Sequence, residues 1–214
     1  EIEWKLVTSA SRMDMVTSGG IDLECGSTTS NAERSKHVAF SPIIFIAGTK
    51  LMVKRNSPIK SFRDLKNKVV AVTAGTTNEK TMQDLQRKFS LNFGLAVGRD
   101  HEDSLALLLD NKAHAFATDD VLLNSMIVRR KLQKDYKVVG EFLSYDPYGI
   151  MFRKDDPALA RVVNATLHSM GKEGELERIY NQWFMRRLPS GERLDMPPSP
   201  YLETVFSTFG EKPE

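Results

Sequence analysis

The stretch Ile21–Arg34 reads Ile-Asp-Leu-Glu-Cys-Gly-Ser-Thr-Thr-Ser-Asn-Ala-Glu-Arg. Apolar and polar residues alternate over its first five positions, which is the period of a β-strand. A hydroxyl-rich turn follows, and Ser30 stands three residues before Glu33, as in a capping box, so we predict a helix capped by Ser30. A turn of this kind collects backbone N–H groups and hydroxyls near Arg34, which suits a bound carboxylate. A capped helix carrying a solvated arginine is the alternative interpretation.

Composition places the rest of the chain among soluble globular proteins. The 214 residues are 41% hydrophobic and 27% charged, with a formal net charge of +2. This small charge gives no reason to expect nucleic acid as a partner, and no apolar run reaches the roughly 20 residues of a membrane span. No zinc spacing, P-loop or dinucleotide fingerprint occurs, so we predict no metal and no cofactor. The single Cys25, at the end of a predicted strand, is expected to be a packed thiol.

Strands and helices alternate after residue 61. Lys68–Val72 reads as a buried strand and Ala113–Ala117 as a further strand, and Ser61, Thr76 and Asp100 each stand where a helix cap is expected. This order predicts an α/β fold with mostly parallel sheets covered by helices on both faces. Further on, a long helix is predicted with Pro157 as its first residue.

Two breaks divide the pattern into lobes. They lie near Ala47–Leu51 and Phe142–Gly149. We therefore expect one split lobe, residues 1–47 plus 146–214, and one continuous lobe, residues 48–145. The first lobe is expected to contain a strand at Ile2–Thr8, with Trp4 and Trp183 as core or lobe-packing aromatics. Ligands of open parallel sheets bind at the carboxyl ends of the strands, where these strand-to-helix turns lie.

Many short runs, in this order, are similar to the periplasmic amino-acid-binding proteins that feed ABC transporters, and within them to the glutamate/aspartate-binding group. The similarity extends from about Lys5 to about Met196 and includes the runs Glu24–Thr29, Glu33-Arg34, Ala39–Ser41, Gly75–Thr77, Asp100-His101, Asp119-Asp120 and Arg153–Pro157. The resemblance implies a type II periplasmic-binding-protein fold, with two hinge-connected lobes that close on a ligand.

The resemblance also implies a ligand with three charges, an amino acid with a second carboxylate. Each charge needs an opposite partner in a partly dry cleft between the lobes, because an unpaired buried charge is costly. Arg34 can hold the α-carboxylate in a bidentate fork. Ser27 and Thr29 add hydroxyl donors from the same turn, and Thr77 offers a second cluster of donors from lobe two.

The remaining ligand charges are assigned by the same resemblance. Asp119 ends a strand and can accept the ligand's ammonium; an ordinary helix cap is the alternative. His101, Ser9 and Arg12 are implied as donors to the side-chain carboxylate. Ser9 and Arg12 stand three apart and are expected to share a helical face. The alternatives are a surface histidine at 101 and a solvated arginine at 12.

The start of the chain departs from the family pattern. The family's first lobe normally begins with a strand and a helix before the strand predicted at Ile2–Thr8, and that earlier strand brings a binding arginine. There is no signal peptide either. We therefore expect a truncated or fragmentary chain, in which neighbouring strands are left unpaired and self-association becomes possible.

Several functions are compatible with these residues. The first is a non-catalytic periplasmic protein that captures glutamate or aspartate and delivers it to an ABC permease; glutamine is an alternative ligand, since an amide can also accept hydrogen bonds. The second is the ligand-sensing extracellular domain of a receptor. The third is an enzyme similar to cyclohexadienyl dehydratase, which would need a general acid in the cleft.

Overall fold

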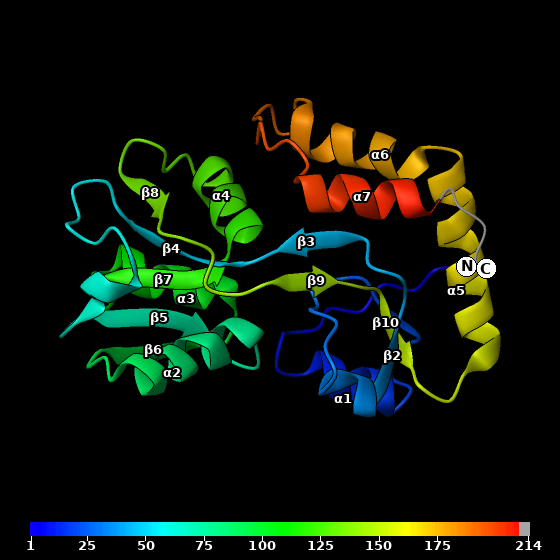
Figure 1. The fold of residues 1–214 in the computed structure, drawn as a ribbon, viewed down its shortest axis with the longest axis horizontal. Coiled ribbons are helices and arrows are strands. Elements are labelled where there is room, and N and C mark those ends of the chain that lie inside the picture. The colour runs from blue at the N-terminus through cyan, green and yellow to red at the C-terminus, as the bar shows by residue number, and fades with distance from the viewer. Residues whose placement is uncertain (210–214) are drawn as a thin grey trace. The chain divides into compact units, whose positions relative to one another are not determined.

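The computed structural model describes residues 1–209, and the chain divides into two compact units. Unit 1 comprises Glu1–Val7, Ser11–Ile46 and the chain from Pro147 onward; unit 2 comprises Thr8–Ala10 and Ala47–Asp146. Residues 210–214 of the expected first lobe lie outside the described residues. Unit 2 is cyan to green in Figure 1, and unit 1 is blue at its start and yellow to red at its end.

Unit 2 is built on a five-stranded sheet in the order β6-β5-β7-β4-β8. β5 pairs in parallel with both β6 and β7, whereas β4 is antiparallel to β7 and β8. The sheet therefore has one reversed strand. The strands are β4 (Thr49–Lys54), β5 (Val69–Thr73), β6 (Gly94–Gly98), β7 (Ala115–Asp119) and β8 (Tyr136–Val139).

The helices of unit 2 begin where the sequence predicts. The Thr76 hydroxyl accepts the N–H of Glu79, and the Asp100 carboxylate accepts the N–H of Asp103, so both residues cap the helices that follow them. Ser61 caps a short 3₁₀ helix in a complete capping box. These elements are η2 (Phe62–Leu65), α2 (Thr77–Phe89), α3 (His101–Leu109) and α4 (Asp120–Arg129).

Both faces of this sheet are covered. In β5, Val70 and Val72 pack in a cluster with Met82 of α2, while Ala71 packs on the other face with Leu105 of α3. Side chains alternate between the faces of a strand, so a strand buried on both sides reads as a continuous apolar run. This explains why the apolar run at 69–72 predicts a buried strand.

The sheet of unit 1 is small and antiparallel. Its order is β1-β10-β2, and Met151 lies opposite both Glu24 and Phe40. A separate two-stranded sheet joins β3 and β9. The elements of this part are α1 (Arg12–Thr17), β1 (Leu23–Glu24), η1 (Arg34–Lys36), β2 (Val38–Phe40), β3 (Phe45–Ala47), β9 (Asp146–Tyr148) and β10 (Met151–Arg153).

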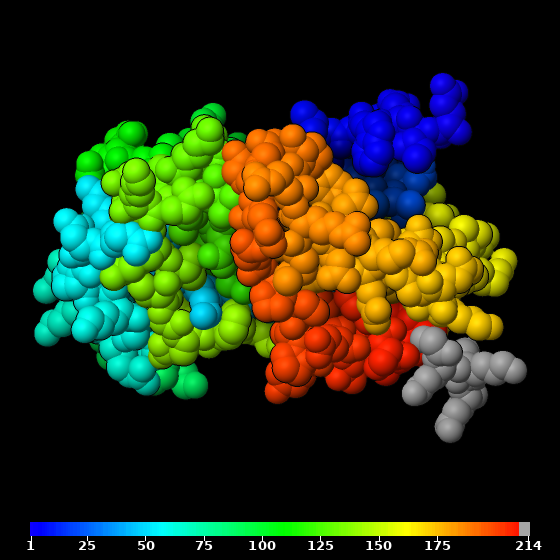
Figure 2. Space-filling model, turned by 90° about the horizontal axis from the view of Figure 1, so that it is seen from above, coloured from blue at the N-terminus to red at the C-terminus, as the bar shows by residue number. Residues whose placement is uncertain are grey.

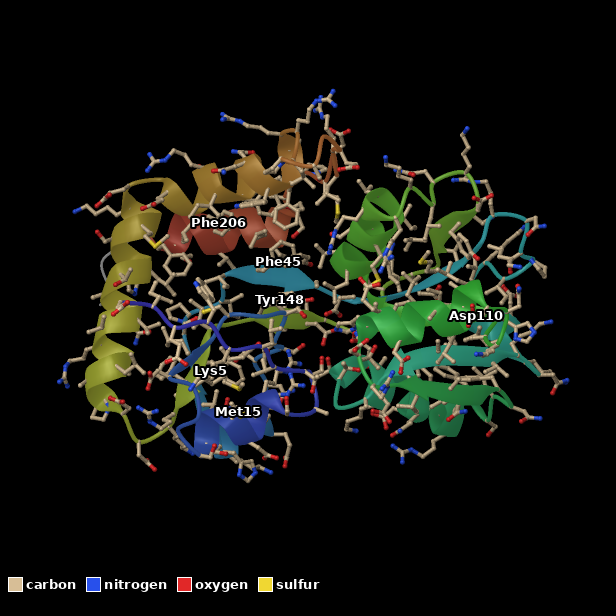
Figure 3. The ribbon with its side chains drawn as sticks, turned by 180° about the vertical axis from the view of Figure 1, so that it is seen from behind. Lys5, Met15, Phe45, Asp110, Tyr148 and Phe206 are labelled. Atoms are coloured by element: carbon tan, nitrogen blue, oxygen red, sulfur yellow. The ribbon has the colours of Figure 1, made fainter. Side chains whose placement is uncertain are left out.

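An aromatic cluster holds the C-terminal helices against these strands. The rings of Phe45 and Tyr148 stack at 5.6 Å, Tyr180 stacks on Phe184 at 4.6 Å, and Phe206 meets Tyr180 edge-on. Figure 3 shows Phe45 and Tyr148 side by side, with Phe206 on the neighbouring helix. The helices are α5 (Pro157–Lys172), with Pro157 as its first residue as predicted, α6 (Glu175–Tyr180), η3 (Asn181–Met185) and α7 (Pro200–Thr208).

The predicted strand at Ile2–Thr8 is wrong, because residues 1–8 form no strand. Trp4 is 85% exposed and Leu6 is fully exposed, and Figure 2 shows the N-terminal residues, in blue, projecting from the rest of unit 1. Trp183 is also 47% exposed, so neither tryptophan is a core residue. An alternating pattern specifies a strand only when a neighbouring strand bonds its backbone. None of the described helices is long and apolar enough to cross a membrane.

The buried ring of Phe116 gives a test of the unit 2 core. Phe116 is 0% exposed and lies in β7, whereas Phe142 of the same unit is 58% exposed. We expect Phe116→Ala to lower the free energy of unfolding by about 3–5 kcal/mol. Phe142→Ala removes a mostly exposed ring that makes a cation–π contact with Lys50, and it should cost about 1 kcal/mol or less. Guanidinium unfolding followed by circular dichroism measures both, and equal costs would contradict this placement of the core.

Candidate ligand-binding site

The hydroxyl-rich turn of unit 1 is fixed by its backbone. Thr28 and Thr29 are 0% and 4% exposed. The Ser30 N–H donates to the carbonyl of Pro147 at 2.7 Å, and Thr29 forms a β-bridge with Tyr148. The turn is therefore held against β9 rather than left as a free surface loop.

The capping box predicted at Ser30 is wrong. The Asn31 side chain, not Ser30, accepts the N–H of Arg34, at 2.9 Å. Only the three-residue η1 follows, and its N-cap residue Glu33 makes no side-chain cap bond. Asn side chains satisfy a nearby backbone N–H in turns as readily as in caps, so the spacing alone could not distinguish a turn from a helix.

Arg34 nevertheless lies on the predicted turn. Its Nη1 donates to the carbonyl of Thr29 at 2.8 Å, and the residue is half-buried. Ser27, also half-buried, belongs to the same turn. The structure thus brings together Arg34, Ser27 and Thr29, three of the candidate binding residues.

Arg12 is buried, so its interpretation as a solvated helix charge is wrong. It is 5% exposed, and its Nη1 donates to Thr28 Oγ1 at 2.5 Å and to the Ser27 carbonyl at 3.2 Å. The hydroxyl of Thr28 in turn donates to Glu24 Oε2, and Arg12 Nη1 lies 4.0 Å from Glu24 Oε1. Glu24 also accepts the N–H of Gly26. A compact buried cluster of Arg12, Thr28 and Glu24 therefore underlies the turn.

Glu24 and Thr28 are residues that the strand pattern misses. Alternation predicts Leu23 and Cys25 inside, but Leu23 is 41% exposed, Cys25 is exposed, and Glu24 is 5% exposed. The packed thiol expected at 25 is therefore wrong, although partial burial, and then the Glu24 carboxylate, raise the pKa of the Cys25 thiol. The strand pattern carries no signal for the burial of Glu24, because the charge that offsets it belongs to Arg12, which is not close in sequence.

The prediction that Ser9 and Arg12 share a helical face is wrong, because α1 begins only at Arg12. Thr8–Ala10 instead belongs to unit 2 and lies against Gly75, where an added Cβ would be 2.9 Å from Ala10 Cα and 3.1 Å from the Ser9 carbonyl oxygen. Gly75 also has a φ of +74°, a conformation that other residues rarely adopt. A glycine is therefore needed at this approach.

Asp119 ends β7 and is 3% exposed. It stands at the N-cap position of α4 but makes no side-chain cap bond, so its interpretation as an ordinary cap is wrong. Its Oδ1 instead accepts from Asn78 Nδ2 at 2.7 Å. The adjacent Asp120 accepts the N–H of Gly48, and burial raises the pKa of the Asp120 carboxyl.

Thr77 and His101 each begin a helix of unit 2, as predicted. Thr77 Oγ1 donates to Asp146 Oδ1 at 3.0 Å. His101 Nδ1 lies 3.0 Å from Thr73 Oγ1, at the end of β5, and the histidine is half-buried rather than a surface residue. Ser9, Thr77, His101 and Asp119 thus belong to unit 2, whereas Arg12, Ser27, Thr29 and Arg34 belong to unit 1.

Residues 1–209 contain no group of three or more His, Cys, Asp or Glu side chains placed to hold a metal ion. What the arrangement offers instead is hydrogen-bond donors and paired charges at the ends of strands and the starts of helices. Groups of this kind are suited to hold a charged small molecule.

A family model described as bacterial extracellular solute-binding proteins, family 3, matches residues 1–186. The chain belongs to this family. Its fold is accordingly the two-lobe α/β fold of the type II periplasmic amino-acid-binding proteins.

Two curated relatives are named for binding glutamate and aspartate. The chain is 37% identical over 213 residues to the L-glutamate/L-aspartate-binding protein of Pseudomonas aeruginosa, covering 99% of this chain and 70% of that protein. It is 38% identical over 183 residues to the glutamate/aspartate import solute-binding protein of Escherichia coli, covering 86% and 61%. The chain thus spans about two thirds of the length of these relatives.

Solved structures of the same fold hold different amino acids. An ancestral arginine-binding protein bound to arginine is similar with a TM-score of 0.79 and 30% identity, covering 86% of this chain and 80% of that one. The GluR0 ligand-binding core from Nostoc punctiforme, in complex with L-glutamate, is similar with a TM-score of 0.73 and 26% identity, covering 86% and 84%.

The buried cluster of unit 1 gives a test of its geometry. Thr28→Val keeps the shape of the side chain but removes the hydroxyl that links Arg12 to Glu24. We expect a loss of about 1–3 kcal/mol in unfolding free energy, because buried charged groups lose a partner. Thr28→Ser keeps the hydroxyl and should cost only about 0.8 kcal/mol, for the lost methyl. Urea titration compares them, and a Val variant as stable as the Ser variant would disprove the link.

Proposed function

We propose that this chain binds L-glutamate or L-aspartate and delivers it to an ABC permease, as a non-catalytic solute-binding protein working outside the cytoplasmic membrane. The observation that carries this proposal is the 37% identity, over 99% of the chain, to a protein named for binding these two amino acids. The candidate residues of the two units supply the chemistry that such a ligand needs.

Arg34 and its turn are proposed to bind the α-carboxylate. The guanidinium presents a planar fork that matches a carboxylate, and the carbonyl of Thr29 orients it at 2.8 Å. Ser27 and Thr29 add hydroxyls from the same turn. Thr77, at the first position of α2, adds a hydroxyl at a helix N-terminus, where Asp146 fixes its direction.

Asp119 is proposed to accept the ammonium. Its carboxylate ends β7, is 3% exposed and carries the charge opposite to that of the ammonium, and a buried charge is stabilised by an opposite one. An ammonium held this way selects amino acids over simple dicarboxylic acids.

His101, Ser9 and Arg12 are proposed to bind the side-chain carboxylate. Arg12 is not the full positive charge that the sequence suggested, because Glu24 Oε1 lies 4.0 Å from Arg12 Nη1 and offsets part of that charge. Glutamine is therefore the alternative ligand to test. The family also includes relatives named for glutamine, such as the glutamine-binding protein GlnH of Bacillus subtilis, at 32% identity.

A receptor input domain is a second candidate function, favoured by the similarity to the glutamate-bound GluR0 core. It would use the same ligand and the same residues, and differ in its partner. An enzyme is disfavoured because no nucleophile–base pair stands among the candidate residues, and Asp119 is already assigned to the ammonium.

Ligand choice is the first test. We expect isothermal titration of the 214-residue chain to show binding of L-glutamate and L-aspartate, with L-glutamine weaker. A sizing column run in parallel reports whether the chain is monomeric and compact. A compact, folded monomer that binds none of the three would refute the proposal, whereas tighter binding of glutamine would move the assignment to the amide.

Arg34 gives the sharpest test of ligand orientation. We expect Arg34→Ala to weaken glutamate binding about 100-fold or more, because it leaves the bound carboxylate without its partner. Arg34→Lys keeps the charge but loses the fork, so its loss should be intermediate. Arg63→Ala removes an exposed arginine that pairs with Glu141 and should leave binding unchanged. Equal affinities of the Arg34 and Arg63 variants would contradict the placement of the α-carboxylate.

A further inference from the structure

A continuous chain of polar side chains runs through the interior of unit 2. Thr49, Thr118 and Asn78 are 0%, 1% and 2% exposed, and Asp119 and Asp146 are 3% and 2% exposed. These side chains come from three strands, β4, β7 and β9, and from one helix, α2. Polar groups this deep persist only where their hydrogen bonds are made.

Asn78 stands at the branch of this chain. Its Nδ2 donates to Thr49 Oγ1 and to Asp119 Oδ1, each at 2.7 Å, and its Oδ1 lies 3.3 Å from the hydroxyl of Thr118. A carboxylate only accepts, so the amide nitrogen must face Asp119 and the amide oxygen must face Thr118. The orientation of the amide is therefore fixed by its neighbours.

The other hydrogen bonds follow in one direction. The Ser144 hydroxyl donates to Asp146, so it must accept from Thr49 Oγ1, 2.7 Å away. Asp146 also accepts from the hydroxyl of Thr77. Both hydrogens of the Asn78 amide are thus committed, one to Asp119 and one to the path that ends at Asp146.

Packing and capping do not explain an asparagine at this position. The helix α2 is already capped by Thr76, and Met82, one turn after Asn78 on the same buried face, is apolar. Asn is also a poorer helix former than Leu or Met, but an apolar residue at 78 would give the neighbouring Thr49 and Asp119 oxygens no hydrogen bond. What only an amide supplies here is a pair of donors, one of which reaches Asp119.

We propose that Asn78 is a positioning residue for ligand binding: it holds the buried Asp119 carboxylate ionised and fixes the direction in which it faces. This rests on the proposed role of Asp119 in accepting the ammonium. A buried carboxylate that loses a donor becomes easier to protonate, and a protonated Asp119 cannot balance an ammonium. Asn78 therefore acts on affinity through Asp119, without being assigned a ligand contact of its own.

Other charged groups lie close to Asp119, and their titration must be distinguished from that of Asp119. Asp120 is adjacent in the chain and lies in the field of Lys50, and Asp146 is joined through Ser144 and Thr49. A titration must therefore assign each carboxyl individually.

The first readout is the pKa of Asp119 in the ligand-free chain, from carboxyl ¹³C resonances assigned by the signal missing in Asp119→Asn. We expect Asn78→Leu to raise this pKa by about one unit or more. Thr118→Val removes a buried hydroxyl next to Asn78 but leaves the bond to Asp119, so it should leave that pKa nearly unchanged. Asn78→Ser, with one donor, gives an intermediate shift and serves if the Leu variant does not fold.

The second readout is glutamate affinity against pH. Asn78→Leu should weaken binding about tenfold or more near its raised Asp119 pKa, with recovery as the pH rises and Asp119 ionises. Thr118→Val should follow the unaltered chain over the same range. A loss of affinity that is the same at every pH would contradict the inference.

An unchanged Asp119 pKa in a folded Asn78→Leu or Asn78→Ser variant would overturn the inference. The two proposals can fail separately. If the unaltered chain binds neither glutamate nor aspartate, the proposed function is wrong, yet the ligand-free titration still decides whether Asn78 controls Asp119.

Discussion

A carboxylate taken out of water needs hydrogen-bond donors inside the protein, and the interior of unit 2 is organised to supply them to Asp119. Asp119 is the last residue of β7, the central strand of the sheet, which pairs with both β4 and β5. Asn78 reaches it from α2, and Thr49 and Thr118 hold Asn78 in place. The apolar clusters on the two faces of the sheet fix the strand and helix from which these side chains project. The hydrogen bonds between these polar side chains keep one geometry because the close-packed apolar clusters hold the strands and helix that carry them.

Unit 1 meets the same requirement with a different set of residues. Arg12 and Glu24 are both buried, and Thr28 links them by accepting from one and donating to the other. Arg12 also donates to the carbonyl of Ser27, in the turn that carries Thr29 and holds the guanidinium of Arg34. Each unit therefore presents candidate binding groups whose positions are fixed by buried partners. This is the preorganisation that keeps the cost of binding low.

The sequence predicted the parts of the fold that local rules determine. Helix caps at Ser61, Thr76 and Asp100, and the buried strand β5, follow from residues close in sequence. The family resemblance supplied the candidate binding residues, which no local pattern selects. Burial of Glu24 and the role of Asn78 were not predicted, because both depend on partners far along the chain, Arg12 and Asp119. The predicted strand at Ile2–Thr8 failed for a related reason, since alternation alone does not provide a pairing strand.

The fold does not determine the ligand, because a protein with the same fold binds arginine, and another binds glutamate. The identity of the ligand is thus decided by a few side chains. We propose that Asp119 and Arg34 hold the ammonium and the α-carboxylate, the two groups that every amino acid shares, and that His101, Ser9 and Arg12 contact the side chain. A crystal structure of the chain with L-glutamate tests this most directly. The account predicts the ammonium nitrogen within hydrogen-bond distance of the Asp119 carboxylate, and the α-carboxylate in the fork of Arg34. A bound glutamate in the reverse orientation, or one that contacts neither residue, would contradict it.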